Sequence, residues 1–209
     1  MRIPKPPLLL ITDRTIARKN IESVVSDAIE GGCRWIMVRE KDLPPSELAT
    51  VVRMVLQTAR PSGATVIVNS DTTVADSCGA QGVHLPAGRS ISAARRAVGR
   101  DALLGVSVHS LEEARNAEAE SADYVTISPI FRSVSKPEYG DPMGLDRLRL
   151  LAMEISMPVV ALGGVTPQNA RDCMAAGAAG VAVLGTIMLS KDPRATTEEY
   201  VRALDKTAR

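Results

Sequence analysis

Short runs of apolar residues alternate with longer amphipathic segments along the whole chain. Eight of these runs have the length of β-strands, and each is followed by a helical pattern or by a turn that leads into one. They are residues 8–11, 35–38, 65–68, 82–85, 103–106, 124–127, 159–162 and 180–184. Regular alternation of strands and helices predicts a parallel sheet, and eight such units predict closure into a barrel. We therefore expect one α/β domain over residues 1–209, a single (β/α)8 TIM barrel.

Two sequence signals at expected helix starts support this phasing. Ser110 and Glu113 have the spacing of a capping box, in which the two side chains satisfy backbone N–H groups of the first turn. Thr166 places a capping hydroxyl directly before Pro167, a residue that suits the first turn of a helix.

The connection over residues 128–144 is longer and more polar than the others. Loops of this length in compact domains are usually functional or disordered. Because it follows the sixth strand, we expect it at the end of the barrel where active sites lie, as a lid over a charged ligand. The alternative is a surface excursion without a function.

Composition and charge exclude several classes of protein. Lysine and arginine number 25 and aspartate and glutamate 24, so net charge gives no signal of a nucleic-acid partner. No apolar stretch approaches the length of a membrane span, and the first apolar run is too short for a signal peptide. Cys33, Cys78 and Cys173 form no metal-binding or C-x-x-C pattern, which favours small buried side chains in a reducing compartment. We expect a cytoplasmic protein without a membrane partner.

Two strand ends near the C-terminus carry glycine. Gly163 and Gly164 follow the seventh run, and Gly185 and Thr186 follow the eighth. Backbone without a Cβ lets a phosphate group approach closely, and the loops after strands seven and eight form the usual phosphate site of this barrel. We therefore predict a phosphorylated ligand at this place. The alternative is that the glycines only make tight turns from strand to helix.

Polar side chains gather at the carboxyl ends of the other strands, where this fold places function. They are Arg39, Lys41, Asn69, Asp71, His84, Ser107 and His109, with Lys136 in the long connection. The cations suit a diphosphate, and a carboxylate such as Asp71 is a ligand that Mg²⁺ prefers. A cationic rim with a carboxylate is typical of a site where a diphosphate leaves with its charge neutralised.

Several of these residues also have a purely structural interpretation. Glu40 would pair with a neighbouring lysine or arginine, and Asp71 would cap a helix that starts near Thr72. His84 and His109 are the only histidines, and either would equally well be a packed core histidine.

Seven short motifs, taken in order along nearly the whole chain, resemble one known family. They are residues 38–41, 68–71, 82–85, 105–109, 122–125, 128–131 and 161–165. Each motif alone is weakly specific, but the ordered set is strong. The chain is similar to thiamine phosphate synthases and to their relatives, the thiazole tautomerases.

The resemblance implies a reaction that joins a hydroxymethylpyrimidine diphosphate to a thiazole phosphate. Pyrophosphate leaves, and the thiazole nitrogen attacks the resulting pyrimidine-stabilised cation. The resemblance also implies roles for residues: Arg39, Lys41 and Asn69 at the pyrimidine and diphosphate, Asp71 at Mg²⁺, Ser107 and Lys136 at the pyrophosphate, and Ser133, Ser135, Gly164, Gly185 and Thr186 at the thiazole phosphate.

The chain departs from the synthase pattern after the fourth strand and within the second. Arg89 stands where the family has a second Mg²⁺-binding aspartate, and Met37 stands where it has a glutamine. Residues 84–88 and 107–113 look more like the tautomerase branch, but that branch has a catalytic histidine where this chain has Pro129.

Three functions follow as alternatives. The first is a synthase in which Arg89 supplies part of the charge of Mg²⁺. The second is a metal-independent tautomerase that uses His84 or His109 as its base, and the third is a phosphate-binding protein without turnover. The retained basic cluster and Asp71 favour the synthase. We expect small phosphorylated heterocycles as ligands, and the sequence leaves open whether the chain forms a homo-oligomer.

Overall fold

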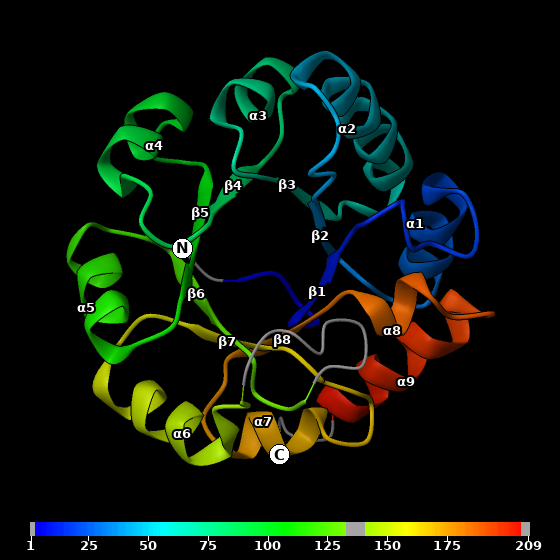
Figure 1. Cartoon of the computed structure of the whole chain (residues 1–209). Helices are drawn as coiled ribbons and strands as arrows, with labels where there is room; N and C mark the ends of the chain where they lie inside the picture. Colours follow the sequence, from blue (N-terminus) through cyan, green and yellow to red (C-terminus); the bar gives the residue numbers. More distant parts are fainter. Residues whose placement is uncertain (1–2, 133–140, 206–209) are drawn as a thin grey trace.

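Eight parallel strands close into a barrel in the order of the chain, and Figure 1 looks along the barrel axis. The computed structural model describes residues 3–132 and 141–205. The strands are β1 (Leu8–Ile11), β2 (Trp35–Val38), β3 (Thr65–Asn69), β4 (Gly82–Leu85), β5 (Leu103–Val108), β6 (Tyr124–Ile127), β7 (Val159–Leu162) and β8 (Gly180–Val183). The predicted TIM barrel is confirmed. Only the ends differ: β3 and β5 continue further than predicted, and β8 stops before Leu184.

Helices surround the barrel and pack on its outer face (Figure 1). They are α1 (Ile21–Glu30), α2 (Pro45–Ala59), α3 (Thr72–Cys78), α4 (Ile91–Val98), α5 (Leu111–Ala119), α6 (Gly144–Glu154), α7 (Ala170–Ala175), α8 (Gly185–Met188) and α9 (Pro193–Asp205), with the 3₁₀ turn η1 (Arg60–Ser62) after α2. Two helices follow β8: the short α8 begins directly at the strand end, and α9 completes the outer ring next to α1.

The two faces of each strand bury different sets of side chains. Leu8 and Leu10 of β1 point outward into the large cluster between the sheet and the helices. Leu9 and Ile11 alternate with them and point into the barrel, where they meet Trp35 and other inner residues. This alternation follows from the pleat of a strand. It also places every second residue of β3, β4, β5 and β6 inside the barrel.

The helix starts agree with one capping prediction and with only part of the other. Ser110 caps α5 by accepting from the N–H of Glu113, and the Glu113 carboxylate accepts from the N–H of His109. Pro167 is not in a first helical turn, because α7 begins only at Ala170. The Thr166 hydroxyl does accept from a backbone N–H, that of Asn169 at 3.4 Å, but in the turn before α7. In the same turn the amide oxygen of Asn169 accepts from the N–H of Thr166 at 2.7 Å.

The chain before β1 covers the amino-terminal opening of the barrel. In Figure 1 this segment crosses the opening from the N-terminus to β1. Ile3 is buried among the inner residues, and the carbonyl of Pro7 accepts from the N–H of Val181 at 2.9 Å. The described residues of this segment therefore cover the inner core at the amino-terminal end of the barrel.

Two expectations about composition can be compared with the described residues. Cys33 and Cys173 are buried and Cys78 is half-buried, and all three are free thiols, as the sequence predicts. Within residues 3–132 and 141–205, no helix has both the length and the apolar character needed to cross a membrane.

Candidate active site

A cavity of about 530 Å³ opens at the carboxyl ends of β7, β8 and their neighbours. Five predicted site residues line it: Arg39, Gly163, Gly164, Gly185 and Thr186. Much of its remaining wall is aliphatic, with Ile11, Leu162, Ala182, Leu184 and Leu189. The cavity thus combines a cation, exposed backbone and an apolar surface large enough for a small heterocycle.

The glycines after β7 serve the packing of the protein's own chain. Gly163 and Gly164 have positive φ angles of 93° and 64°. A Cβ on Gly164 would lie 2.6 Å from the carbonyl oxygen of Arg132, and one on Gly163 would lie 2.7 Å from the Cα of Pro129. The N–H of Phe131 also donates to the carbonyl of Gly163 at 2.9 Å. The segment after β6 therefore needs this bare backbone whether or not a ligand binds.

The backbone N–H groups at the two glycine-bearing ends could still bind a ligand. Among hydrogen bonds of the described residues, none uses the N–H of Gly164, Gly185 or Thr186 as donor. The Thr186 hydroxyl donates to the carbonyl of Val165 at 3.3 Å, which joins the loop after β7 to the start of α8. Such N–H groups beside a helix start suit an anion.

Arg39 follows β2 and lines the cavity. The buried carboxylate of Glu40 holds its backbone in position through Thr12. The side chain of Arg39 is only 12% exposed and lies 3.5 Å from Asp13. Its backbone N–H donates to the hydroxyl of Thr12 at 3.0 Å, and that hydroxyl donates to Glu40 at 2.6 Å. The second oxygen of Glu40 accepts from the N–H of Arg14 at 2.8 Å. In the described residues Glu40 has no ion pair, so the expected pairing with a lysine or arginine side chain is wrong.

Burial of Glu40 has an electrostatic consequence. Loss of solvent raises the pKa of its carboxyl, while the Thr12 hydroxyl and the Arg14 N–H lower it in part. The group is held by two neutral donors rather than by a cation. It joins the ends of β1 and β2 and so sets the position of Arg39.

His84 lies inside the barrel among hydroxyl groups. Its Nδ1 is 2.9 Å from the Tyr124 hydroxyl, and its Nε2 is 3.0 Å from the Ser107 hydroxyl. Burial lowers the pKa of His84 to about 3, so the imidazole is neutral at working pH. Of the two interpretations of this residue, its environment matches a packed core histidine.

Ser107 and Asn69 lie higher in the barrel, toward the carboxyl ends. Both are half-buried and occupy inner positions of β5 and β3. The amide of Asn69 donates to the hydroxyl of Ser70 at 2.8 Å. Ser70 has a φ of 68°, a conformation that is rare outside glycine. This strained residue turns the chain sharply between Asn69 and Asp71.

Asp71 caps α3 as its structural interpretation predicts. Its Oδ1 accepts from the N–H of Val74 at 2.8 Å. No hydrogen bond or ion pair of the described residues uses its other oxygen, which is open to a ligand. Capping and ligand binding are thus compatible in this side chain.

Three further predicted residues lie exposed on the same rim. Lys41 and Arg89 make no hydrogen bond or ion pair with the described part of the chain. The Nδ1 of His109 is 3.4 Å from the carbonyl of Ser128, which leaves the ring largely in solvent. Ser133, Ser135 and Lys136, together with the proposed lid, lie outside the described residues.

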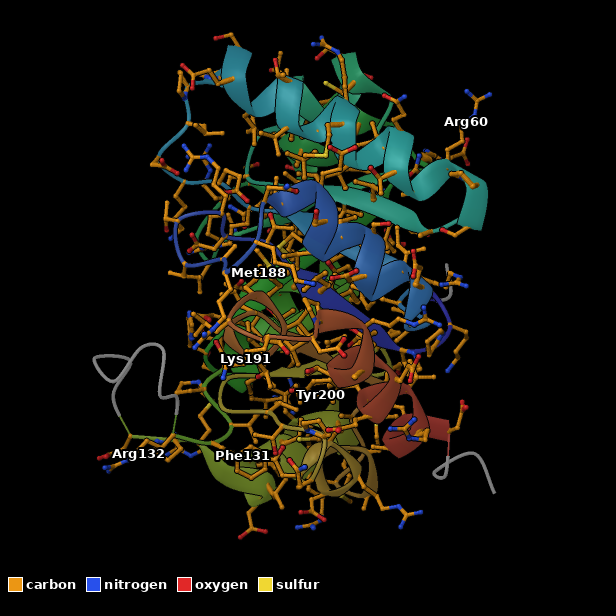
Figure 2. All side chains as sticks on the ribbon, turned by 90° about the vertical axis from the view of Figure 1, so that its right-hand side faces the viewer. Arg60, Phe131, Arg132, Met188, Lys191 and Tyr200 are labelled. Carbon is orange, nitrogen blue, oxygen red and sulfur yellow. The ribbon has the colours of Figure 1, made fainter. Side chains whose placement is uncertain are left out.

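Arg132 is a site residue that the sequence reasoning missed. It lines the cavity next to Gly163 and Gly164. Figure 2 shows Arg132 at the carboxyl-terminal edge of the barrel, on the same half as Lys191, whereas Arg60 lies at the opposite end. Its place directly before Ser133 was the available signal. Thr12 and Tyr124 were also missed, because only their contacts reveal their roles.

The side chains at this site can bind a magnesium ion only if a ligand supplies further oxygen atoms. The described residues contain no group of three acidic, histidine or cysteine side chains that could hold a metal. Mg²⁺ is commonly bound by one or two carboxylates together with substrate phosphates. Asp71, with one oxygen open, meets this requirement when a diphosphate supplies the other ligands.

Comparison with known proteins places the chain among relatives of one kind. The family described as thiamine monophosphate synthase matches residues 8–187. A thiamine-phosphate synthase of Methanoculleus marisnigri is 39% identical over 183 residues, which cover 87% of this chain and 87% of that protein. One from Roseiflexus sp. is 36% identical over 210 residues, covering 96% of this chain and 87% of that protein. The solved structure of a thiamine phosphate pyrophosphorylase from Pyrococcus furiosus superposes with a TM-score of 0.87 at 32% identity, covering 97% and 96%.

The fold and these relatives define a (β/α)8-barrel transferase of thiamine biosynthesis. Within that class the chain belongs to the thiamine monophosphate synthase family.

Proposed function

We propose that this protein couples hydroxymethylpyrimidine diphosphate to thiazole phosphate and releases pyrophosphate. The observation that carries the proposal is the cavity itself. Its lining combines Arg39, two glycine-bearing strand ends and an aliphatic wall, in a chain of the synthase family. The arginine suits a diphosphate, and the glycine-bearing strand ends suit a phosphate monoester.

The thiazole phosphate binds at the ends of β7 and β8. The N–H groups of Gly164, Gly185 and Thr186 donate to its phosphate oxygens, since the described residues use none of them internally. Ser133 and Ser135 complete this site, as the family resemblance implies. The ring lies on the aliphatic wall, which includes Ile11 and Ala182.

The diphosphate lies toward β2, β3 and β5. Arg39, Lys41 and Lys136 neutralise its charge, and Ser107 and Asn69 bind polar atoms of this substrate. In the reaction the bond between the pyrimidine methylene carbon and the diphosphate oxygen breaks, and its electron pair leaves with pyrophosphate. The lone pair of the thiazole nitrogen then forms the new C–N bond. Fixed positive groups that match the charge of the leaving group are expected to supply most of the rate enhancement.

Asp71 would hold Mg²⁺ through its open oxygen, together with the diphosphate. When bound, the ion supplies further positive charge to the leaving group. Arg89 lies on the same rim and adds a fixed positive charge where the family has a second acidic ligand. We therefore expect this enzyme to bind Mg²⁺ through its substrate rather than in a site formed in advance.

Two observations favour the synthase over a tautomerase. A tautomerase needs a base that exchanges protons near neutral pH. His84 is buried and its low pKa makes it a poor base. Arg39, by contrast, is held in the cavity by a buried network, as the binding of a diphosphate requires.

The proposal is tested by a coupling assay on the purified protein. Both substrates and Mg²⁺ are supplied, and thiamine phosphate is detected after oxidation to its fluorescent product. We expect Mg²⁺-dependent product, a large loss of it in Arg39→Gln, and no loss in Arg96→Gln, a matched change on the exposed face of α4. A folded protein that isomerises thiazole phosphate but forms no thiamine phosphate would be a tautomerase instead.

A further inference from the structure

Tyr124 reaches His84 across a strand that lies between them. In the sheet register, His84 of β4 pairs with Gly105 of β5, and Gly105 pairs with Tyr124 of β6. A Cβ on Gly105 would lie 2.0 Å from the ring of Tyr124. The absence of a side chain at Gly105 therefore lets the tyrosine ring lie over β5. The hydroxyl then meets Nδ1 of His84 at 2.9 Å.

The order of protons in this chain of hydrogen bonds can be assigned from the partners. Tyr124 and His84 are fully or almost fully buried. Among the described residues, the Tyr124 hydroxyl has no hydrogen-bond partner other than His84. If Nδ1 carried the imidazole proton, the tyrosine proton would have no acceptor, and a buried donor without a partner is costly. The tyrosine hydroxyl therefore donates to Nδ1.

This assignment fixes the remaining protons. A neutral imidazole that accepts at Nδ1 carries its proton on Nε2, and burial keeps the ring neutral by lowering the pKa of His84. Nε2 then donates to the Ser107 hydroxyl oxygen at 3.0 Å. The hydroxyl of Thr126 donates to the same oxygen at 3.4 Å. The Thr126 hydroxyl oxygen also lies 3.4 Å from Nε2, a longer contact than that of Nε2 with Ser107, and it can accept from Nε2 while donating to Ser107. Ser107 thus accepts from two buried donors, and its own proton is left for the open end of the barrel.

We propose that Tyr124 is a positioning residue that, through His84, orders these protons so that the Ser107 hydroxyl always donates toward the ligand. A serine without this arrangement can turn its proton inward to a histidine nitrogen and present a lone pair to the ligand instead. An anionic oxygen would be repelled by that lone pair. The arrangement therefore selects for a ligand with negatively charged oxygen at Ser107. The nature of that ligand, a diphosphate, rests on the proposed function.

The proton order is tested directly by nitrogen NMR of the histidine side chains. The chain has two histidines, and the His84 signals are assigned by comparison with the His109→Gln variant, in which only His84 remains. We expect His84 of the wild-type protein to be neutral with its proton on Nε2, and Tyr124→Phe to show a mixture of both neutral forms. Tyr200→Phe is the matched control: it removes another buried hydroxyl, which donates to Val165 far from His84, and should leave the tautomer unchanged. A proton on Nδ1 or a charged ring in the wild-type protein would overturn the proposal.

Kinetics test the consequence at Ser107. Loss of a hydrogen bond to a charged group in Ser107→Ala should lower kcat/KM for the diphosphate substrate about ten- to hundredfold. Tyr124→Phe, which keeps the ring, should lower it about three- to tenfold. The double variant should be no worse than Ser107→Ala, because both changes act through one hydroxyl. A Tyr124→Phe enzyme with wild-type kcat/KM, alongside an impaired Ser107→Ala, would overturn the proposal.

A failure of the proposed function can be told apart from a failure of this inference. If the wild-type protein forms no thiamine phosphate, calorimetric binding of inorganic pyrophosphate replaces kinetics as the measurement. Weaker binding in both Ser107→Ala and Tyr124→Phe, with the Nε2–H form in the wild-type protein, would support the inference without the coupling reaction. Equal binding by all three proteins would refute it.

Discussion

The hydroxyl of Thr12 donates to the buried carboxylate of Glu40 at 2.6 Å. The same hydroxyl oxygen accepts from the backbone N–H of Arg39 at 3.0 Å. One threonine thus transmits the position of a buried acid to the arginine of the cavity. The carboxylate is required in this arrangement because both of its oxygens accept, one from Thr12 and the other from the N–H of Arg14.

Replacement of Glu40 by its amide should therefore be harmful although it conserves shape. In Glu40→Gln one end of the side chain becomes a donor and faces either the Thr12 hydroxyl or the Arg14 N–H. We expect a loss of about 1–3 kcal/mol in the free energy of unfolding, measured by urea denaturation, and a lower kcat/KM for the diphosphate substrate. Glu47→Gln, an exposed change at the start of α2, is the control and should alter neither quantity. Equal stability of the two variants would contradict the role assigned to Glu40.

His84 should make the stability of the protein depend on pH. Burial lowers its pKa to about 3 from the ordinary value of 6.5. Below pH 6.5 the unfolded chain takes up a proton that the folded protein does not, so stability is full above this value and is lost as the pH falls toward 3. Between about pH 6.5 and pH 4.5 the loss from this residue should be about 2–3 kcal/mol.

The measurement is urea denaturation over this pH range in pairs of variants. His84→Gln should be less stable at neutral pH but should lack this part of the pH dependence. His109→Gln should keep it, because His109 is exposed. If wild-type and His84→Gln proteins lose stability in parallel, His84 is not the buried neutral group described above.

Gly164 should tolerate alanine far less well than another glycine of similar backbone geometry. Gly164 and Gly63 have φ angles of 64° and 66°. A Cβ on Gly63 would meet no atom within 4 Å, whereas one on Gly164 would meet the carbonyl oxygens of Phe131 and Arg132 at 2.7 and 2.6 Å. Gly63→Ala should lower the free energy of unfolding by about 1–2 kcal/mol, which is the cost of a left-handed backbone conformation for alanine.

Gly164→Ala should cost clearly more than that and should also weaken the binding of thiazole phosphate. The added methyl group pushes the segment after β6 away from the end of β7. Urea denaturation and calorimetric titration with thiazole phosphate measure the two effects. Similar losses of unfolding free energy in both variants would mean that the backbone at Arg132 moves away from the new methyl group without a loss of stability.

Asp71 combines a cap with the proposed metal ligand, and two substitutions separate these roles. Asparagine is as good a cap as aspartate, so Asp71→Asn should keep the stability of the protein and lose Mg²⁺-dependent turnover. Asp71→Ala should lose turnover and about 1 kcal/mol of stability as well. Asn20→Ala, which removes the side chain that caps α1, should reproduce the stability loss without the loss of turnover. Normal Mg²⁺ dependence in Asp71→Asn would mean that Asp71 caps α3 and does not bind the metal.

The sequence predicted the barrel well because its strands are short apolar runs that begin and end sharply. Trp35 to Val38 and Tyr124 to Ile127 are strands with the predicted bounds. It also located the cavity, since the glycine-bearing ends and Arg39 follow directly from strand order. Pro167 was misplaced, because a threonine–proline pair is equally suited to the turn that precedes α7.

The sequence was less informative about contacts between strands. His84 resembles a catalytic histidine and a core histidine equally until the Tyr124 hydroxyl is seen on its ring. The glycines after β7 resemble a phosphate loop, and only the space filled by the segment after β6 shows their second role. These features depend on register and on which face of a strand a side chain occupies. A local sequence motif indicates neither of them.

The edge of Trp35 packs against the ring of Tyr124, with the ring centres 4.8 Å apart. Trp35 is the single tryptophan of the chain, fully buried under the covered end of the barrel. Fluorescence excited selectively at the indole therefore reports one site only. The indole packs on Tyr124, whose hydroxyl is joined to Ser107 by two hydrogen bonds through His84. The protein thus carries an intrinsic optical probe whose emission should follow ligand arrival in real time, without a label and without turnover.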